Sequence, residues 1–260
     1  MSTLVVHSAL LTRRSLLAMW RQPAYVVVTL VQPVIWLLLF GSLFTKVVDI
    51  PGFSTPGTSY VTFLTPGVVM MTALFSATWA GTVYIEDMRV GIMDRLLASP
   101  VSRGAMMNGT LAYQSVVTVL QSLAVFAIGL AAGARFGSAW SGLAVTLLAA
   151  VLLTVFFAAV SNATALLVRQ QEALIGISQL VSLPLAFLSS AVMDLALAPQ
   201  WVQDVARYNP LNWAVEASRS ALSATPDWGI VWSRLGALAV LAVLMAWLAS
   251  RAFGAYQKSV

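Results

Sequence analysis

Residues that commonly carry out catalysis are scarce in this sequence and do not fall into catalytic patterns. There is no cysteine and a single histidine, His7. Without thiolates or a second imidazole, the usual ligand sets for zinc, haem or an iron–sulfur cluster are missing. The sequence also contains no Gly-Lys pair, and therefore no Walker A loop for a nucleotide phosphate, no Gly-x-Ser-x-Gly and no His-Glu-x-x-His. We therefore expect no catalytic residue, no metal site and no cofactor bound by this chain.

Acidic side chains, which proton-coupled carriers use inside the membrane, are confined to the polar parts of the sequence. All nine acids, from Asp49 to Asp227, fall between the long apolar runs or at their ends. A carrier driven by protons usually needs a buried Asp or Glu relay within its spans. The pattern therefore argues against a non-ATP secondary carrier, although that class and a channel remain alternatives.

The composition indicates a protein whose solvent is lipid. Of 260 residues, 60% are hydrophobic and 9% are charged, and the mean hydropathy is +0.88. A soluble domain has about 25% charged residues and could not cover its surface with this set. A net charge of +5 could suggest a nucleic-acid partner, but the 14 Lys and Arg are scattered between apolar runs. We therefore predict an all-α integral membrane protein with no nucleic-acid partner.

Six apolar runs are each long enough, at about 20 residues, to cross the hydrocarbon core as a helix. They cover residues 24–45, 61–85, 110–133, 143–168, 173–192 and 230–250. The fifth run is the least apolar, because Gln179 and Pro184 interrupt it. No repeat or linker divides the sequence, so we expect one transmembrane domain over residues 1–260.

The basic residues predict the orientation of these spans. An even number of spans puts both termini on one side, and nine of the Lys and Arg residues fall on that side against five on the other. Because an excess of Lys and Arg stays in the cytoplasm, we expect a multi-pass protein of the cytoplasmic membrane with both termini inside.

Residues 1–22 precede the first run and have a weakly amphipathic pattern. Val6, Leu10 and Leu17 share one helical face, on which Arg13 also falls. We expect a helix that lies along the inner membrane surface, with the Arg13 charge snorkelling into the headgroups. An ordinary basic arm before the first span is an equally good interpretation.

The second inner loop, residues 86–103, is the most polar stretch on the predicted cytoplasmic side. Residues 86–98 are compatible with a short helix, in which Met88, Ile92 and Leu96 form an apolar stripe beside a charged face. Such a helix can dock into a groove of a soluble partner. The alternative is a solvated loop whose charges only set the topology, and the pattern alone favours this alternative.

The long segment 193–229, predicted to be outside, is too apolar for a simple connector. Asn209 can cap a helix whose first residue is Pro210. Apolar and polar positions then recur at helical spacing, so we expect an amphipathic helix that lies in the interface or re-enters the membrane. Glu216 and Arg219 lie three positions apart on its polar face, and we expect an ion pair between them.

Polar side chains within the apolar runs are few. The candidates are Gln114, Thr118, Gln121, Ser161, Asn162 and Gln179. These residues could line a transport path, but hydrogen bonding between helices is the more common role for polar residues in spans.

Three motifs, each at the corresponding place in the predicted topology, resemble the membrane subunits of ABC-2 type transporters. They are the arm Met19-Trp20-Arg21-Gln22-Pro23 with Gln32-Pro33, the loop from Glu86 through Gly91 to Arg103, and Pro199-Gln200-Trp201 with Asn209-Pro210-Leu211 and Arg219. The likeness covers nearly the whole chain and is nearest to permeases of the daunorubicin-resistance type. Ile92 departs from the pattern, since many members have threonine there.

The resemblance implies an ATP-driven exporter in which two permeases, as a homodimer or heterodimer, pair with two copies of a separate ATP-binding subunit. That subunit would use ATP and Mg, and membrane lipid would surround the permeases. The segment 86–98 becomes the coupling helix, and 193–224 becomes a pair of outer re-entrant helices that cap the path. The implied coupling residues are Glu86, Asp87, Arg89, Gly91, Asp94, Arg95, Pro100 and Arg103, and the implied outer residues are Asn209, Pro210, Glu216 and Arg219.

The expected substrate is a hydrophobic drug, an antibiotic or a lipid, because the spans are aromatic and apolar and carry no fixed charge. A polysaccharide or glycolipid is the alternative. A structural or enzyme-anchoring membrane protein is a further interpretation, against which the polar faces and the long outer segment argue.

Overall fold

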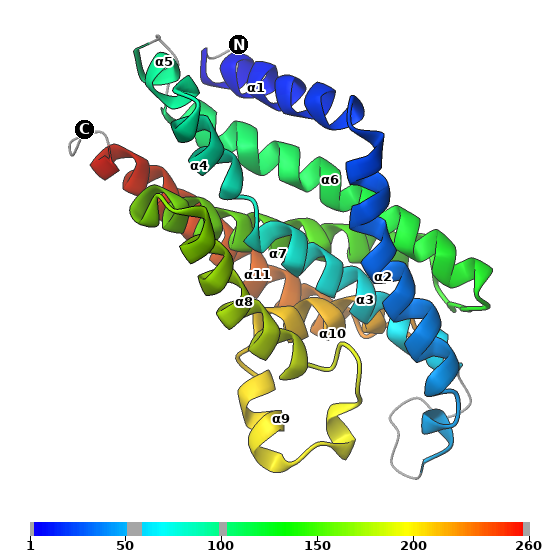
Figure 1. Cartoon of the computed structure of the whole chain (residues 1–260). Helices are drawn as coiled ribbons and strands as arrows, with labels where there is room; N and C mark the ends of the chain where they lie inside the picture. Colours follow the sequence, from blue (N-terminus) through cyan, green and yellow to red (C-terminus); the bar gives the residue numbers. More distant parts are fainter. Residues whose placement is uncertain (1–2, 51–58, 99–102, 257–260) are drawn as a thin grey trace.

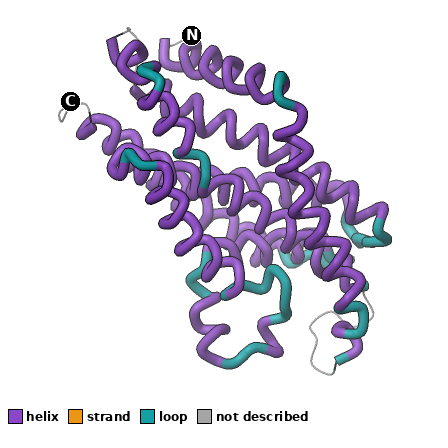
Figure 2. Tube along the Cα trace, viewed as in Figure 1, coloured by secondary structure: helices purple, strands orange, loops and turns teal. Residues whose placement is uncertain are grey.

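Helices make up the fold in the part of the chain that the computed structural model describes, residues 3–50, 59–98 and 103–256 (Figure 2). In chain order they are α1 (Thr3–Trp20), α2 (Pro23–Leu43), η1 (Val47–Asp49), α3 (Tyr60–Thr78), α4 (Thr82–Arg89), α5 (Ile92–Ala98), α6 (Arg103–Ala131), α7 (Ala139–Val168), α8 (Gln171–Phe187), η2 (Leu195–Leu197), α9 (Gln200–Ala206), α10 (Pro210–Leu222) and α11 (Trp228–Tyr256). Across these described residues there is no strand, so the predicted all-α class is confirmed.

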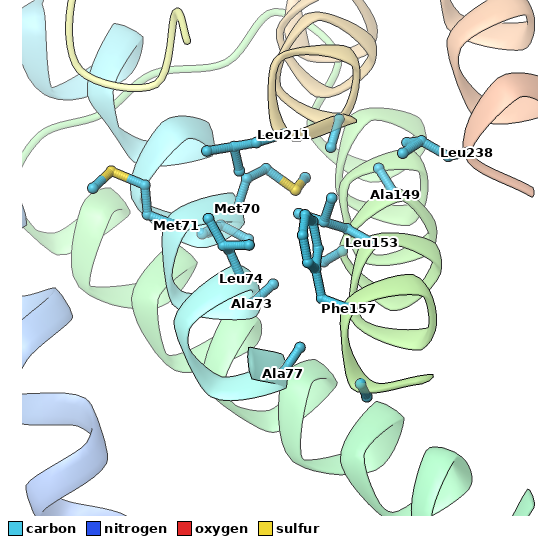
Figure 3. Close-up of a cluster of buried hydrophobic side chains, with 14 of the residues drawn as sticks. Met70, Met71, Ala73, Leu74, Ala77, Ala149, Leu153, Phe157, Leu211 and Leu238 are labelled. Carbon is cyan, nitrogen blue, oxygen red and sulfur yellow. The ribbon is translucent and has the colours of Figure 1, made fainter. Parts of the chain in front are cut away.

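Helix α7 lies at the centre of the bundle, packed against α3, α6, α10 and α11 (Figure 1). Its sequence is apolar on all sides, as expected for a helix surrounded by other helices. Leu153 of α7 lies in one buried cluster with Leu74 of α3, Leu211 of α10 and Leu238 of α11 (Figure 3). The core therefore joins elements from most of the length of the chain.

An apolar helix occurs at each of the six predicted places. Four stretches are long and apolar enough to cross a membrane, namely Tyr60–Arg89, Gly104–Ala131, Trp140–Val168 and Trp228–Ala252. The apolar parts of α2 and α8, Val27–Leu43 and Gln171–Phe187, are shorter. A helical protein with several spans is therefore confirmed, and the full count of six remains a prediction.

The predicted second span is interrupted. Helix α3 ends at Thr78, a turn follows, and α4 begins at Thr82. At the turn, the N–H groups of Ala80 and Thr82 bond to carbonyl oxygens three residues earlier, in place of the α-helical pattern. The predicted span is therefore two helices joined by a turn at residues 79–81.

The prediction of one continuous helix over residues 86–98 is wrong. The segment consists of the end of α4 and the whole of α5, with Gly91 between them at φ +70°. A left-handed conformation inside a helix breaks the hydrogen-bond ladder, and glycine adopts it without steric cost. This segment is therefore a helical corner formed by α4 and α5, and it is called the inner corner below because it is predicted to lie on the inner side of the membrane.

The two ends of the bundle differ in structure. The start of α1, the corner α4–α5, the start of α6 and the end of α11 gather at one end (Figure 1). Helix α9 and η1 lie at the opposite end (Figure 1). Because both ends of the described chain lie at the same end of the bundle, the arrangement agrees with an even number of membrane crossings.

Candidate functional site

The candidate site is a cavity of about 370 Å³ between α2, α3, α6 and α8. Large apolar and aromatic side chains form most of its wall, and none of the lining residues carries a charge. The aromatic ones are Trp36 of α2, Phe75 and Trp79 at the end of α3, and Phe187 of α8. Such a surface suits a ligand with a flat apolar body.

Amide side chains from three helices reach the same cavity: Gln32 of α2, Gln121 of α6 and Gln179 of α8. Gln121 is only 6% exposed, and its Oε1 is buried with no hydrogen-bond partner among the described residues. A buried amide oxygen without a partner costs about 1–3 kcal/mol. Because this oxygen is itself buried, a ligand in the cavity could bond it, and recover this free energy, only after the Gln121 side chain has rotated.

The polar residues predicted from the spans separate into two groups. Gln121 and Gln179 line the cavity, and Gln114 lies behind it and donates a 2.6 Å bond to the Oγ of Ser76, a lining residue. Thr118 instead pairs with Thr154 of α7, with their hydroxyl oxygens 2.9 Å apart. Three of the six residues predicted to line a transport path therefore line the cavity or contact its wall.

Ser161 and Asn162 of α7 make helix–helix contacts and lie outside the cavity wall. Asn162 is fully buried, and its Nδ2 lies 3.4 Å from the Sδ of Met107 on α6. The cavity residue that the span patterns missed is Gln32. It is the only amide side chain in the run 24–45, and this was the signal that could have found it.

The turn between α3 and α4 is held by hydroxyl groups from two other helices. The carbonyl oxygen of Thr78 accepts 2.7 Å bonds from the Oγ atoms of both Ser161 on α7 and Ser178 on α8. The N–H of Gly81 donates to Ser161 Oγ at 3.0 Å. Trp79, which directly follows Thr78, lines the cavity. The turn therefore joins the cavity wall directly to the inner helical corner.

The inner corner has charged side chains that are exposed on the surface of the protein. Glu86 and Arg89 form an exposed ion pair at 2.8 Å, and Arg95 is also exposed. Asp87 lies 3.3 Å from Arg14 of α1. Of the other predicted coupling residues, Pro100 lies outside the described residues, as do the side chains of Asp94 and Arg103.

The apolar stripe predicted for docking does not face outward. Met88 and Leu96 pack against the core of the chain, and Met93, between them in sequence, is fully buried. The prediction failed because Gly91 turns α5 back toward the bundle. Any partner at this corner would therefore meet the charged side.

At the opposite end of the bundle, Asn209 caps α10, as the sequence predicted, and also binds the end of α8. Its Oδ1 accepts the N–H of Leu211 at 2.9 Å and so caps α10, with Pro210 as the first residue. Its Nδ2 also donates to the carbonyl oxygens of Leu185 and Leu188, at the end of α8. One side chain therefore fixes the start of α10 to the end of α8.

The turn after α8 is fastened by polar side chains from α3 and α10. Asn212 Oδ1 accepts the N–H and the hydroxyl of Ser190, at 2.9 and 2.7 Å. Tyr60 donates its hydroxyl to the carbonyl oxygen of Val192 at 2.7 Å. Because most of α10 is buried against α3, α7 and α11, this helix is part of the bundle and is not a surface helix.

Arg219 binds main-chain carbonyl groups and not the predicted acid. Its Nε and Nη2 donate to the carbonyl oxygens of Phe63 and Ala191, at 3.2 and 3.3 Å, and its guanidinium lies 3.6 Å from the centre of the Phe63 ring. Glu216 instead pairs with Arg234 of α11 at 2.7 Å. The predicted pair between Glu216 and Arg219 is wrong because α10 lies between α3 and α11, and the two side chains find partners on different helices.

Burial lowers the pKa of Arg219 to about 9, while its electrostatic interactions with Asp194, Tyr60 and Glu216 act in the opposite direction. The guanidinium therefore still carries its proton at neutral pH. A charged guanidinium can hold two carbonyl oxygens more strongly than a neutral donor could.

Comparison with known proteins gives the class that these features define. Residues 8–223 match the model of the ABC-2 type transporter family, and the chain belongs to that family. The chain is 31% identical over 224 residues to the ycf38 transport permease of Porphyra purpurea, covering 86% of this chain and 76% of that one. It is 26% identical over 220 residues to the daunorubicin resistance ABC transporter permease protein DrrB1 of Streptomyces coeruleorubidus, covering 84% and 76% of the two chains. Nodulation protein J of Rhizobium meliloti is 28% identical over 219 residues, with 82% and 80% covered.

The family confirms the resemblance seen in the sequence. ABC-2 permeases are multi-pass membrane subunits of ABC transporters and work with an ATP-binding subunit. This chain is therefore the membrane subunit of such a transporter.

Proposed function

We propose that this permease exports a hydrophobic drug, antibiotic or lipid, and that the substrate passes through the cavity between α2, α3, α6 and α8. The observation that carries the proposal is the chemistry of the wall, which combines aromatic side chains with three amides and no charge. Two relatives have names that refer to resistance against daunorubicin and doxorubicin, which agrees with this chemistry.

The position of the cavity supports access from the lipid. Helices α2 and α8 each have an exposed apolar face beside it, with Val28 67% and Leu180 76% exposed. A ligand dissolved in the membrane could move between these helices without passing through water. A strongly hydrated sugar polymer would gain little from such a wall.

The energy for transport would come from a partner. We propose that two copies of an ATP-binding subunit, with ATP and Mg, dock at the inner corner of two permeases with cytoplasmic termini. Glu86, Arg89 and Arg95 supply exposed charges there. The turn Trp79–Gly81 links that corner to the cavity wall, so a displacement of α4 would move Trp79.

The test uses the permease with its ATP-binding subunit in inside-out vesicles and daunorubicin fluorescence as the readout. Trp36→Ala and Gln121→Ala are expected to lower ATP-dependent accumulation severalfold, because both residues line the cavity. Trp140→Ala is the matched control, since Trp140 is 87% exposed and does not line the cavity. Equal losses in all three variants, or no accumulation by the unmodified complex, would overturn the proposal for this class of substrate.

A further inference from the structure

A second hollow lies between α1 and α6, at the inner end of the bundle. It is an open groove of about 540 Å³. Its walls are mainly apolar, with four polar residues among them, and its lining residues are Leu4, Val5, Ser8, Ala9, Thr12, Arg13, Leu16, Asn108 and Ala112. None of the described residues that line it is acidic.

Close packing at one point creates this groove. A Cβ added to Gly109 of α6 would lie 2.9 Å from the Cβ of Leu11, so α1 approaches α6 through a glycine. Thr12 Oγ, which donates to Ser8 O at 2.9 Å, also lies 3.1 Å from the carbonyl oxygen of Gly109, a second acceptor at the same contact. Beyond this contact the two helices leave the hollow open on one side.

Among the side chains that the structure describes, Arg13 is the one charged group that lines the groove. It is exposed, and no acidic partner lies within ion-pair distance among the described residues. Its neighbour Arg14 differs, because it pairs with Asp87 of α4. The hydroxyl of Ser8 donates a hydrogen bond of 2.8 Å to the carbonyl oxygen of Leu4. The guanidinium of Arg13 is therefore available to an external anion.

The surroundings of the groove indicate where that anion comes from. Leu10, Leu17 and Trp20 of α1 are 56%, 47% and 78% exposed, which suits a helix that lies in the membrane interface. An apolar hollow beside this face matches an acyl chain, and an unpaired guanidinium at its rim matches a phosphate.

We propose that this groove binds one anionic phospholipid of the inner leaflet, with an acyl chain along the apolar wall and the phosphate at Arg13. Lipid bound there fills the space between α1 and α6. Because Arg14 ties α1 to Asp87 of α4, the lipid also stabilises the position of the inner corner. This site is separate from the cavity and does not depend on the proposed transport substrate.

The first test is lipid binding by the purified permease in detergent, titrated with phosphatidylglycerol or phosphatidylcholine and read by native mass spectrometry. Arg13→Gln is expected to weaken phosphatidylglycerol binding about fivefold, since one basic residue near an anionic surface contributes about 1 kcal/mol. Arg13→Lys should keep most of the binding. Arg21→Gln is the matched control, because Arg21 is exposed just after α1 and does not line the groove.

The second test fills the groove without changing the charge. Ala112→Phe should lower phosphatidylglycerol binding, whereas Ala127→Phe, on an exposed part of α6 away from the groove, should not. Circular dichroism confirms that each variant is folded. The proposal is overturned if Arg13→Gln and Arg21→Gln weaken binding equally, if Ala112→Phe binds like the unmodified protein, or if phosphatidylcholine binds as tightly.

Discussion

Ser161 of α7 is bonded to both sides of the helix break in the second span. Its hydroxyl donates to the carbonyl oxygen of Thr78 at 2.7 Å and accepts the N–H of Gly81 at 3.0 Å. It thereby replaces hydrogen bonds that a continuous helix would have made within itself. The break is therefore stabilised by specific hydrogen bonds from α7, and it lies between the cavity and the inner corner.

Ser161→Ala should destabilise the protein more than Ser178→Ala. Without Ser161, the buried N–H of Gly81 loses its partner, at a cost of about 1–3 kcal/mol, while Thr78 O still accepts from Ser178. Ser178→Ala removes one of two donors to the same oxygen and should cost about 0.5–1.5 kcal/mol. Thermal unfolding in detergent gives the order, and an equal shift for both variants would show that the Gly81 bond has no net effect.

Gly81→Ala should also be destabilising, because a Cβ there would collide with the carbonyl oxygen of Ser161 and would lie 2.8 Å from the Cβ of Ala165. Overpacking of this kind costs about 1–3 kcal/mol when backbone must move. Gly176→Ala on α8 is the control, since nothing lies within 4 Å of its added Cβ. Alanine is the better helix former, so this variant should be neutral or slightly stabilising. A wild-type melting temperature for Gly81→Ala would mean that α4 can move away from α7 freely.

The pairing of charges on α10 gives a double-mutant test. Arg219→Ala removes the donors to Phe63 and Ala191 and should cost about 1.5–3 kcal/mol. Its coupling with Glu216→Ala should be the weaker one, because Glu216 forms its ion pair with Arg234 and acts on Arg219 only through its charge. Glu216→Ala and Arg234→Ala should show a coupling energy of about 0.5–1 kcal/mol, because they remove the same partly exposed ion pair. Coupling between positions 216 and 219, with none between 216 and 234, would contradict the observed arrangement.

The features that the sequence predicted correctly are local ones. The cap formed by Asn209 and Pro210 depends on neighbouring residues, and the six apolar helices depend on the length and hydropathy of each run. The break after Thr78 could not be predicted in this way, because its hydrogen bonds come from Ser161 and Ser178, which lie far away in the sequence. The cavity is likewise formed by residues from four helices.

Charge reversal at the inner corner tests the proposed coupling. Glu86→Lys should lower ATP-dependent transport severalfold without loss of the inserted protein, because Glu86 is exposed and its ion-pair partner among the described residues is Arg89 on the same helix. Glu172→Lys, at the exposed start of α8 in the other inner loop, is the control. Copurification of the ATP-binding subunit and transport are measured together. Normal values of both in the Glu86 variant would remove this corner from the coupling surface.

The absence of cysteine allows the orientation to be tested with single introduced thiols. Arg89→Cys, at the inner corner, and Lys46→Cys, between α2 and η1, are exposed positions on predicted opposite sides of the membrane. In intact cells, a maleimide that cannot cross the membrane should label position 46 and should leave position 89 unlabelled until the membrane is permeabilised. Because the excess of Lys and Arg on one side is the basis for cytoplasmic termini, the reverse pattern would contradict the charge argument and turn the whole topology over. Labelling of both positions from outside would instead remove one crossing between them, and the six-span count with it.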